Sequence, residues 1–401
     1  MANIKKIEGK NGISYKLTAS GGYRIDGSQK RYYKTWTPEP GMTSKQIEKE
    51  LNRQAVLFDE ECRTGGVSTD GSIKFEAFAK QWFKEYAEPR LKTRTLDRYH
   101  QMEERVYTAV GHLRIDKITT RSIQLFVANL SEPGMNKRTG KPLSPKTIKN
   151  YHGFISSIMH YAVSQGIIRQ NPCAAVMLPK PAPKDQAEYT LEDAQLFLKT
   201  LETEAPPFWR VFYNLAIYSG FRRGELLGLE WKDIDFDTGV ISIRRTSLYT
   251  KERGVYTDTP KTKGSSRSLK MSQGIIDLLK WYKAFQTEER LKAGDQWEDH
   301  DRVFAAWNGQ PVNPSGVENW LYRFFERTGL KKINPHGFRH LNATLLINSG
   351  ADVRTVSAAL GHSQTSTTLN IYAHAIAEAQ ARATDAISDM LDSSFKGVSA
   401  K

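Results

Sequence analysis

The chain has 401 residues, which suggests two or three domains at about 150 residues each, and its 39% hydrophobic, 10% aromatic and 25% charged residues exclude disorder or a collagen-like fibre. Cys62 and Cys173 form no CxxC pair, so neither a disulfide framework nor a thiolate zinc site is expected. The 58 lysines and arginines against 44 acidic residues give a net charge of +14, which favours nucleic acid as partner, with anionic membranes and acidic proteins as alternatives. No apolar run reaches the roughly 18 residues of a membrane span, and we expect a cytoplasmic protein.

Residues 1–65 predict a small sheet followed by one helix. Between residues 12 and 38, apolar and polar residues alternate as in strands, with turn signals at Gly21-Gly22 and Asp26-Gly27, so we expect three strands there. Thr43 and Gln46 form a capping-box pattern that begins a helix. Basic residues at the polar strand positions suggest that one face contacts DNA, although a solvated face has the same pattern. The candidate DNA contacts are Lys16, Arg24 and Lys34.

Residues 72–177 predict an all-helical domain, preceded by a linker rich in glycine, serine and threonine. Apolar residues spaced by three and four from Phe75 onward indicate one buried helical face. Further helices are expected near Thr93 and Thr119. A fourth is expected between the N-cap Ser144 and the stop at Gly166.

A proline-rich stretch, residues 178–184, predicts a stiff extended connection, and we place the main domain boundary there. Residues 189–401 are mostly helical in pattern, with strand-like runs at 240–243, 255–259 and 267–269 and a helical tail at the end. The predicted fold class is therefore a mainly α, multidomain protein. It comprises a small N-terminal β-sheet plus helix domain, an all-α domain, and a mixed α+β domain that is mostly α.

Common nucleotide and metal motifs are missing from the sequence. It contains no GxxxxGK[ST] loop, no GxGxxG after a strand and no HExxH. The best metal candidate is Asp233-Ile-Asp235-Phe-Asp237, but an EF-hand loop would need glycine and glutamate where Thr238 and Arg244 stand. We interpret these carboxylates as turn residues at the entry to a strand, with a divalent-metal nuclease as the alternative.

Three segments of the last domain carry candidate chemistry. In the first, a helix ends at Gly220 and another begins, which exposes Arg222 for bidentate phosphate contact and places Glu225 one turn later to orient a neighbouring group. The second is a turn between strands with Lys261 near its tip. The third contains His336-Gly-Phe-Arg339-His340, Leu360-Gly-His362 and Asn370-Ile-Tyr372. Each segment alone is also typical of a solvated surface, a helix cap or a core aromatic residue.

Together these segments resemble the tyrosine recombinases, also called the phage integrase family. That family carries an arginine in a T-G-[LM]-R-x-[SG]-E element, a lysine in a β-hairpin, then H-x-[LF]-R-H, L-G-H and a downstream tyrosine. The order and spacing match over about residues 189–391, and no departure removes a polar catalytic group. The upstream domains resemble the core-site-binding domain and the arm-site-binding domain of mobile-element integrases. The departures are Ser219 for threonine, Phe221 and Phe338 for aliphatic residues, and Leu341-Asn342 after the second motif.

The resemblance implies a site-specific recombinase that integrates and excises a temperate phage or an integrative conjugative element through a 3′-phosphotyrosine intermediate. It makes Tyr372 the nucleophile, and it assigns protonation of the leaving 5′ oxygen to Lys261. His336 is also a candidate acceptor for the tyrosine proton, and Glu225 has a supporting role. The groups expected to hold the phosphate are Arg222, His336, Arg339 and His362.

The same resemblance implies that no metal, ATP or other cofactor is used. The expected partners are double-stranded DNA at core and arm sites, three further copies of the chain in a tetramer, an excision or directionality factor and a host DNA-bending protein. The C-terminal helix fits docking onto its own domain or onto a neighbouring protomer. The alternatives are a housekeeping recombinase that resolves chromosome dimers, a type IB topoisomerase, a metal-dependent nuclease and a non-catalytic DNA-binding protein.

Overall fold

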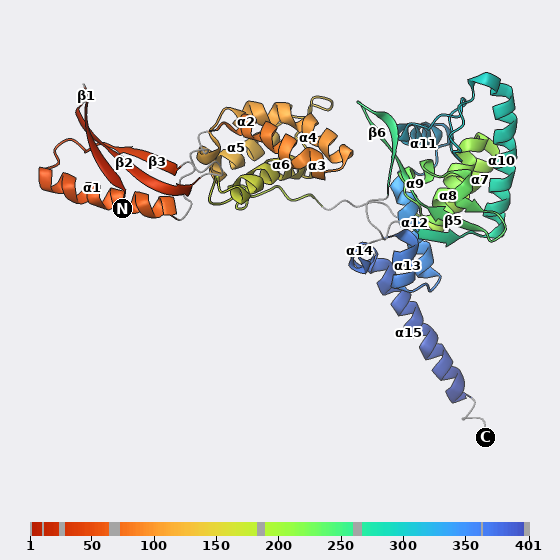
Figure 1. The fold of residues 1–401 in the computed structure, drawn as a ribbon. Helices are drawn as coiled ribbons and strands as arrows, with labels where there is room; N and C mark the ends of the chain where they lie inside the picture. The colour runs from red at the N-terminus through yellow and green to blue at the C-terminus, as the bar shows by residue number, and fades with distance from the viewer. Residues whose placement is uncertain are drawn as a thin grey trace. The chain divides into compact units, whose positions relative to one another are not determined.

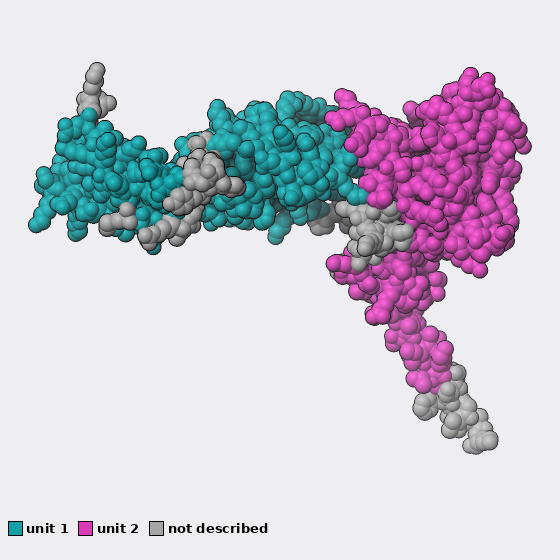
Figure 2. Space-filling model, in the orientation of Figure 1, with its two compact units in different colours: residues 1–184 teal, residues 185–401 magenta. Residues whose placement is uncertain are grey.

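The chain divides into two compact units, Met1–Lys184 and Asp185–Lys401, and the division falls at the end of the proline-rich stretch (Figure 2). The computed structural model describes residues 2–9, 12–23, 29–63, 73–182, 189–259, 267–361 and 364–396. The fold is mainly helical with small antiparallel sheets, as the sequence predicts (Figure 1). Among these described residues, no helix is both long enough and apolar enough to cross a bilayer.

The first unit opens with an antiparallel sheet in the order β1-β2-β3, followed by helix α1. Leu17 and Tyr32 from the sheet and Phe58 from α1 form the centre of a small core. The backbone N–H of Thr43 donates to Oε1 of Gln46 at 2.9 Å, which is the predicted helix start. The elements are β1 (Asn3–Gly9), β2 (Gly12–Tyr23), β3 (Gln29–Trp36) and α1 (Ser44–Arg63).

Two details of this sheet differ from the prediction. The first strand is Asn3–Gly9, in a polar stretch whose weak alternation did not indicate a strand. Gly21-Gly22 lies inside β2, so the predicted turn there is wrong. The pairing register between β2 and β3 shifts between Ser20 and Tyr23, and glycine in a strand interior commonly accompanies such a bulge. Asp26-Gly27 lies outside the described residues.

A second, separate core in this unit is built from helices. Phe75, Trp82 and Phe154 are fully buried at its centre. The Ser144 Oγ accepts from the Thr147 N–H at 3.2 Å, and Gly166 has a φ of 69°, so the predicted start and stop of the fourth helix are confirmed. The elements are α2 (Phe75–Trp82), the π-turn η2 (Phe83–Ala87), α3 (Glu88–Arg90), α4 (Thr93–Val106), η3 (Tyr107–Gly111), η4 (Ile115–Lys117), α5 (Thr120–Leu130) and α6 (Pro145–Ser164).

The second unit packs helices around an aromatic core that includes Phe197, Tyr213 and Phe338. The rings of Phe197 and Phe338 lie 4.9 Å apart, so α7 and α12 meet at the centre of this core. The helical elements are α7 (Leu191–Glu204), α8 (Pro207–Ser219), α9 (Arg223–Leu227), η5 (Trp231–Asp233), α10 (Gln273–Ala293), η7 (Gly294–Gln296), α11 (Pro314–Thr328), α12 (Pro335–Asn348), α13 (Val353–Leu360), α14 (Thr365–Ile371) and α15 (Ala373–Lys396).

Two small sheets complete the second unit. One has the order β4-β5-β8, and the other is the hairpin of β6 and β7. β7 pairs with β6 and β8 pairs with β5, so the two strands on either side of the predicted turn belong to different sheets. Lys261 itself lies outside the described residues. The strands are β4 (Ile234–Asp235), β5 (Val240–Ile243), β6 (Thr246–Thr250), β7 (Gly254–Asp258) and β8 (Arg267–Lys270).

Candidate active site

The break between α8 and α9 places Arg222 at the start of a helix, as predicted. Gly220 ends α8 with a φ of 62°, and a Cβ atom at this position would lie 2.6 Å from Oδ1 of Asn342, so both the conformation and the space require glycine. The Asn342 amide in turn donates to the carbonyls of Ile217 and Tyr218, at 2.9 and 3.1 Å, which satisfies the end of α8. The turn that presents Arg222 is therefore fixed from α12.

Arg222 and Glu225 form a closed pair within the first turn of α9. The Glu225 carboxylate accepts from the backbone N–H of Arg222 at 2.9 Å and from its Nη1 at 2.7 Å. The Arg222 side chain remains 38% exposed while that of Glu225 is 4% exposed. The buried carboxylate thus orients a guanidinium that still faces solvent.

Two glycines bring α9 against β6. A Cβ on Gly224 would lie 2.5 Å from Oγ1 of Thr246, and a Cβ on Gly228 would lie 3.0 Å from the carbonyl oxygen of Arg245. The first distance is shorter than real Cβ contacts, and the second would require the neighbouring backbone to shift by a few tenths of an ångström. The helix that carries Glu225 is therefore seated directly on the backbone of the hairpin.

Three arginines converge on the C-terminal end of α13. Nε of Arg267 donates to the Ala359 carbonyl at 2.7 Å, Nη2 of Arg339 to the Leu360 carbonyl at 2.5 Å, and Nη2 of Arg222 to the Gly361 carbonyl at 3.3 Å. The last carbonyls of a helix lack intrahelical partners and carry the negative end of its dipole, so guanidinium groups suit them. We call Arg222, Arg267, Arg339 and Glu225 the arginine cluster.

Arg339 also ties the cluster to α8. It is 2% exposed, and its Nη1 donates to the Gly220 carbonyl at 2.9 Å. Its position follows from α12, which begins at the Asn334 cap, where the side chain accepts from the Gly337 N–H. The predicted phosphate ligands Arg222 and Arg339 therefore lie at one corner, where the ends of α8 and α13 meet the start of α9.

The charges in the arginine cluster do not balance. Burial lowers the pKa of Arg339 to about 9, and the positive charges of Arg222 and Arg267 add to this shift. Burial alone would raise the pKa of Glu225, but the hydrogen bond from Arg267 and the charges of both arginines hold it below its ordinary value. One ionised carboxylate among three guanidinium groups leaves an excess positive charge that favours an anion.

Tyr372 lies at the end of α14 and is 5% exposed. Its hydroxyl is 2.9 Å from Nδ1 of His340, and the His340 ring packs edge to face on His336 with centroids 4.7 Å apart. Burial raises the pKa of Tyr372, with partial opposition from Arg339, so this phenol needs a base to ionise. Burial, followed by neighbouring positive charges, lowers the pKa of His340 and brings that of His336 to about 4, so both imidazoles are neutral and able to accept a proton.

The structure brings together most of the residues that the sequence predicted for this site: Arg222, Glu225, His336, Arg339 and Tyr372. Lys261, His362 and Arg24 lie outside the described residues. Two residues of this site were not predicted from the sequence. Arg267 follows the predicted lysine segment but has no motif of its own, and His340 stands in the H-x-x-R-H motif without an assigned role.

The two described DNA-contact candidates in the N-terminal sheet lie on opposite faces, so the prediction of one shared face is wrong for them. Lys34 shares its face with the buried Tyr32 and is 3.3 Å from Oε1 of Gln54 on α1. Lys16 lies on the other face, 4.3 Å above the ring of the exposed Tyr33. The alternation of side chains along each strand explains the difference, because Lys34 pairs across the sheet with the buried Leu17.

Two of the three aspartates that form the metal candidate in the sequence have other partners. Asp233 is paired with Arg245, and Oδ1 of Asp235 accepts from the N–H groups of Asp237 and Thr238 in the turn before β5. This is the predicted turn chemistry. Within the described part of the chain, no three histidine, cysteine or acidic side chains gather closely enough to hold a metal ion.

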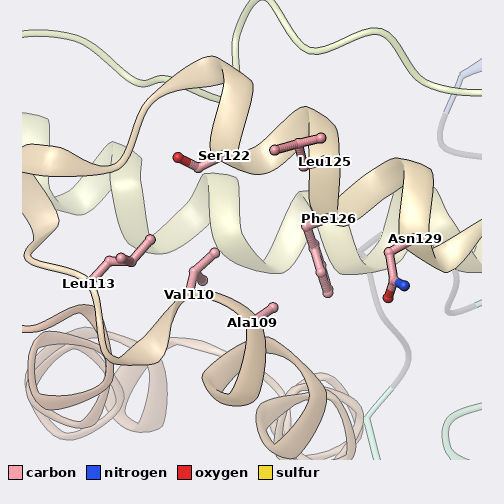
Figure 3. A pocket seen from close by; sticks show the side chains of 7 residues that line it. All are labelled: Ala109, Val110, Leu113, Ser122, Leu125, Phe126 and Asn129. Carbon is pink, nitrogen blue, oxygen red and sulfur yellow. The ribbon is translucent and has the colours of Figure 1, made fainter.

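A pocket in the first unit offers nothing comparable for an anion. It lies between α5 and the turn η3, and no charged side chain lines it (Figure 3). Its lining residues are Ala109, Val110, Leu113, Ser122, Leu125, Phe126 and Asn129. The chemistry of a phosphate site is found instead at the arginine cluster.

A helical domain that sets an arginine cluster beside histidines and a buried tyrosine belongs to a class of enzymes that transfer DNA strands through a tyrosine. Residues 189–379 match the model of the phage integrase family, and residues 75–177 match that of the phage integrase SAM-like domain. The chain is 31% identical over 292 residues to a tyrosine recombinase XerC-like protein of Caldanaerobacter subterraneus subsp. tengcongensis, covering 69% of this chain and 73% of the other. The chain belongs to the phage integrase family and is a site-specific tyrosine recombinase.

Other similar proteins come from mobile elements. The ICEBs1 integrase of Bacillus subtilis is 30% identical over 277 residues, which cover 69% of this chain and 72% of that one. Among solved structures, the Tn1549 transposon integrase in complex with a circular intermediate DNA has a TM-score of 0.65 at 20% identity, covering 78% of this chain and 100% of that chain. A lambda integrase dimer bound to a COC′ core site has a TM-score of 0.53 at 17% identity, covering 73% and 93%. These two likenesses show the shared fold.

Proposed function

We propose that this recombinase is the integrase of a temperate phage or an integrative conjugative element, and that Tyr372 cuts and rejoins DNA through a 3′-phosphotyrosine. The observation that carries the proposal is the tyrosine hydroxyl held by a neutral histidine in the same unit as an arginine cluster with excess positive charge. The similarity to the ICEBs1 integrase supports the mobile-element assignment.

The strand transfer follows from the chemistry of these groups. The guanidinium forks of Arg222 and Arg339 hold the non-bridging phosphate oxygens, and they stabilise the charge that develops in the transition state. The bond from phosphorus to the Tyr372 oxygen forms while the bond from phosphorus to the 5′ oxygen breaks. The tyrosine proton passes to an imidazole, and Lys261 gives a proton to the leaving 5′ oxygen.

The two histidines divide the remaining work. His340 contacts the Tyr372 hydroxyl and is therefore the immediate proton acceptor in this arrangement. His336, also a candidate acceptor, packs edge to face on His340 and joins Arg222 and Arg339 around the phosphate. His362 follows Gly361 directly and completes the phosphate ligands. Because the phosphotyrosine conserves the bond energy, rejoining requires neither ATP nor a metal.

The domain assignments follow from the same proposal. Residues 189–401 carry the chemistry, residues 72–177 bind the core sites, and residues 1–65 bind arm sites. The N-terminal region lies outside both matched family models and has its own hydrophobic core, which supports an added binding function. A housekeeping recombinase that resolves chromosome dimers remains the second candidate, since a relative carries the name XerC-like. Removing residues 1–62 separates the two, because only an integrase would lose integration while keeping core-site cleavage.

Assembly on DNA is also part of the proposal. In the lambda integrase, a tetramer is seen bound to a Holliday junction. In this chain, Ile376 near the start of α15 packs beside Tyr372, whereas Ile387 and Met390 near its end are 57% and 70% exposed. We therefore assign the first turns of α15 to its own domain and its exposed end to a neighbouring protomer in a tetramer. A directionality factor and a host DNA-bending protein complete the expected partners.

The decisive experiment uses the full chain, EDTA and a labelled, nicked DNA from the end of the element, followed by a denaturing gel. We expect a protein-linked DNA band with the wild type and none with Tyr372→Phe, while both bind the DNA. A band that persists in Tyr372→Phe contradicts the assignment of the nucleophile. No band with wild-type protein on DNA that it binds would favour a metal nuclease or a purely binding role.

A further inference from the structure

We propose that Arg267 is a positioning residue of the recombination site, which locks Arg222 and the C-terminal end of α13 into one rigid corner that receives the phosphate. This inference rests on the proposed strand transfer at Tyr372. Arg267 is the third member of the arginine cluster, and no catalytic motif of the sequence contains it.

The contacts of Arg267 join two elements that approach it from different directions. Its Nη2 lies 2.9 Å from Oε2 of Glu225, the carboxylate that also holds Arg222. Its Nε donates to the Ala359 carbonyl at 2.7 Å, two residues before Gly361. One planar guanidinium thus fixes the distance between α9 and the end of α13, and lysine has no fork that reproduces both contacts.

The surroundings of Arg267 leave it little freedom. Its side chain is 7% exposed, and its guanidinium lies 5.0 Å from the centroid of the Phe221 ring. Nη1 is 2.8 Å from the place that a Cβ on Gly361 would occupy, and Gly361 has a φ of 65°. Glycine at position 361 therefore suits both the left-handed turn and the close approach of the guanidinium.

The position of Arg267 in the chain extends its influence to a third group. It is the first residue of β8, where it pairs with Ile243 of β5. Lys261 stands six residues before it. Arg267 therefore stands in a described strand directly after the segment that carries Lys261, in addition to its contacts with Glu225 and Ala359.

Low exposure alone does not separate positioning from phosphate binding, since Arg339 is 2% exposed. Arg267 differs from Arg339 because its guanidinium is paired with the Glu225 carboxylate, whereas Arg339 donates to helix carbonyls. Arg222 is 38% exposed and can reach DNA, whereas the described polar contacts of Arg267 are with Glu225 and Ala359. Loss of Arg267 should therefore slow strand cleavage and leave DNA affinity unchanged. A misplacement of about 1 Å in catalytic groups is enough for a roughly 100-fold loss of rate.

The test compares Arg267→Gln, Arg267→Lys and wild type in single-turnover formation of the covalent complex on nicked DNA, over a range of pH. We expect Arg267→Gln to lower the cleavage rate about 100-fold at neutral pH while its DNA affinity remains that of wild type. Without Arg267, burial dominates at Glu225, so its carboxylate protonates at a higher pH and releases Arg222 there. The rate of Arg267→Gln should therefore start to fall at a higher pH than that of wild type as the solution is acidified.

Two further variants keep the test decisive. We call the fall of the cleavage rate toward low pH the acid limb. Arg267→Lys retains the positive charge beside Glu225, so its acid limb should lie at the same pH as that of wild type, while its cleavage rate stays reduced. Glu225→Gln combined with Arg267→Gln removes the titrating carboxylate, and the shift of the acid limb should disappear. Arg302→Gln is a control of matched burial outside the cluster, and it should destabilise the fold without moving the acid limb.

A purely structural role predicts a different pattern. Arg267→Gln would then behave like Arg302→Gln. Its thermal stability and DNA binding would fall in proportion to the cleavage rate, and its acid limb would stay at the wild-type pH. That pattern would overturn the proposal. A wild-type protein that forms no covalent complex contradicts the proposed function instead, because the role of Arg267 is measured only against an active wild type.

Discussion

Two clusters of arginines contact α9 or the residue after it in the second unit, and they differ in the balance of their buried charges. The arginine cluster sets three guanidinium groups against the single carboxylate of Glu225. In the second, which we call the balanced cluster, Arg245 and Arg302 face Glu230 and Asp233, with side chains between 1% and 16% exposed. Both arginines of the balanced cluster donate to the Gly228 carbonyl at the end of α9.

The comparison shows that burial alone does not identify a functional arginine. Each buried arginine of the balanced cluster has a buried carboxylate partner, and the solvent-exposed Lys232 and Arg244 pair with the same two carboxylates. The buried charges are therefore matched, and the cluster holds the hairpin against α9. The arginine cluster is short of negative charge by two, and its members use helix carbonyls as additional acceptors. An anion would find strong partners in the arginine cluster and would find the balanced cluster already neutralised.

The largest difference should appear when Arg222 is replaced. We expect Arg222→Gln to lower the rate of covalent complex formation by about 1,000-fold, because one of the charges that stabilises the transition state is lost. The melting temperature should change little, since the side chain is 38% exposed. Single-turnover cleavage and thermal unfolding measure the two effects, and a parallel loss of stability would mean that Arg222 acts as the balanced cluster does.

The opposite result is expected in the balanced cluster. Asp233→Asn leaves Arg245 buried beside a weaker partner, and the free energy of unfolding of the catalytic unit should fall by about 3 kcal/mol. The cleavage rate per folded molecule should stay unchanged. Urea unfolding checks the prediction with the exposed Asp237→Asn as control, and a loss of rate without loss of stability would contradict the division between the two clusters.

The histidines provide a test by pH. Because the pKa values of His336 and His340 lie below the ordinary 6.5, both accept protons only in more acidic solution, and cleavage should remain fast until the pH falls below the usual histidine range. His340→Gln should cost about 100-fold in rate because the contact with Tyr372 loses its base. Quenched single-turnover cleavage assays between about pH 4 and 8 measure both the pH dependence and the loss of rate in His340→Gln. A greater loss in His336→Gln than in His340→Gln would return the proton acceptor to His336.

The smallest effect concerns the N-terminal sheet, where one lysine faces inward and another faces outward. Lys16→Ala should reduce the salt dependence of arm-site binding by about one phosphate contact, whereas Lys34→Ala, whose side chain lies against α1, should leave it unchanged. Binding of an arm-site duplex measured from low to high salt checks both variants. An equal dependence of arm-site binding on salt concentration in the two variants would show that the faces of the sheet do not differ in DNA contact.

Local signals in the sequence predicted helices better than strands. Ser144 and Thr119 mark helix starts through contacts within their own first turn, and both appear where the sequence places them. Strand pairing depends on partners that are distant along the chain. The pairing of β7 with β6 instead of β8, and the run of β2 through Gly21-Gly22, therefore could not be inferred from neighbouring residues.

The site was predicted to the extent that its residues carry motifs. Arg222, Arg339 and Tyr372 stand in recognisable patterns, and the structure brings Arg222 and Arg339 to the same helix end. Arg267 carries no such signal, because its value comes from being beside Glu225 and Ala359 after folding. The contact between His340 and the tyrosine hydroxyl likewise depends on how α14 packs on α12.

Two glycines, Gly224 in α9 and Gly228 directly after it, restrict which sequences can form this site. Both lie against residues 245–247, so a side chain at either position would press on the hairpin. In a saturation library selected for recombination, the partly exposed position 223 should accept more residues than Gly224, where a Cβ would lie 2.5 Å from Oγ1 of Thr246 and 2.8 Å from the Ser247 carbonyl oxygen. Gly224 has no side chain that could contact DNA, yet it should be as intolerant to substitution as the nucleophile.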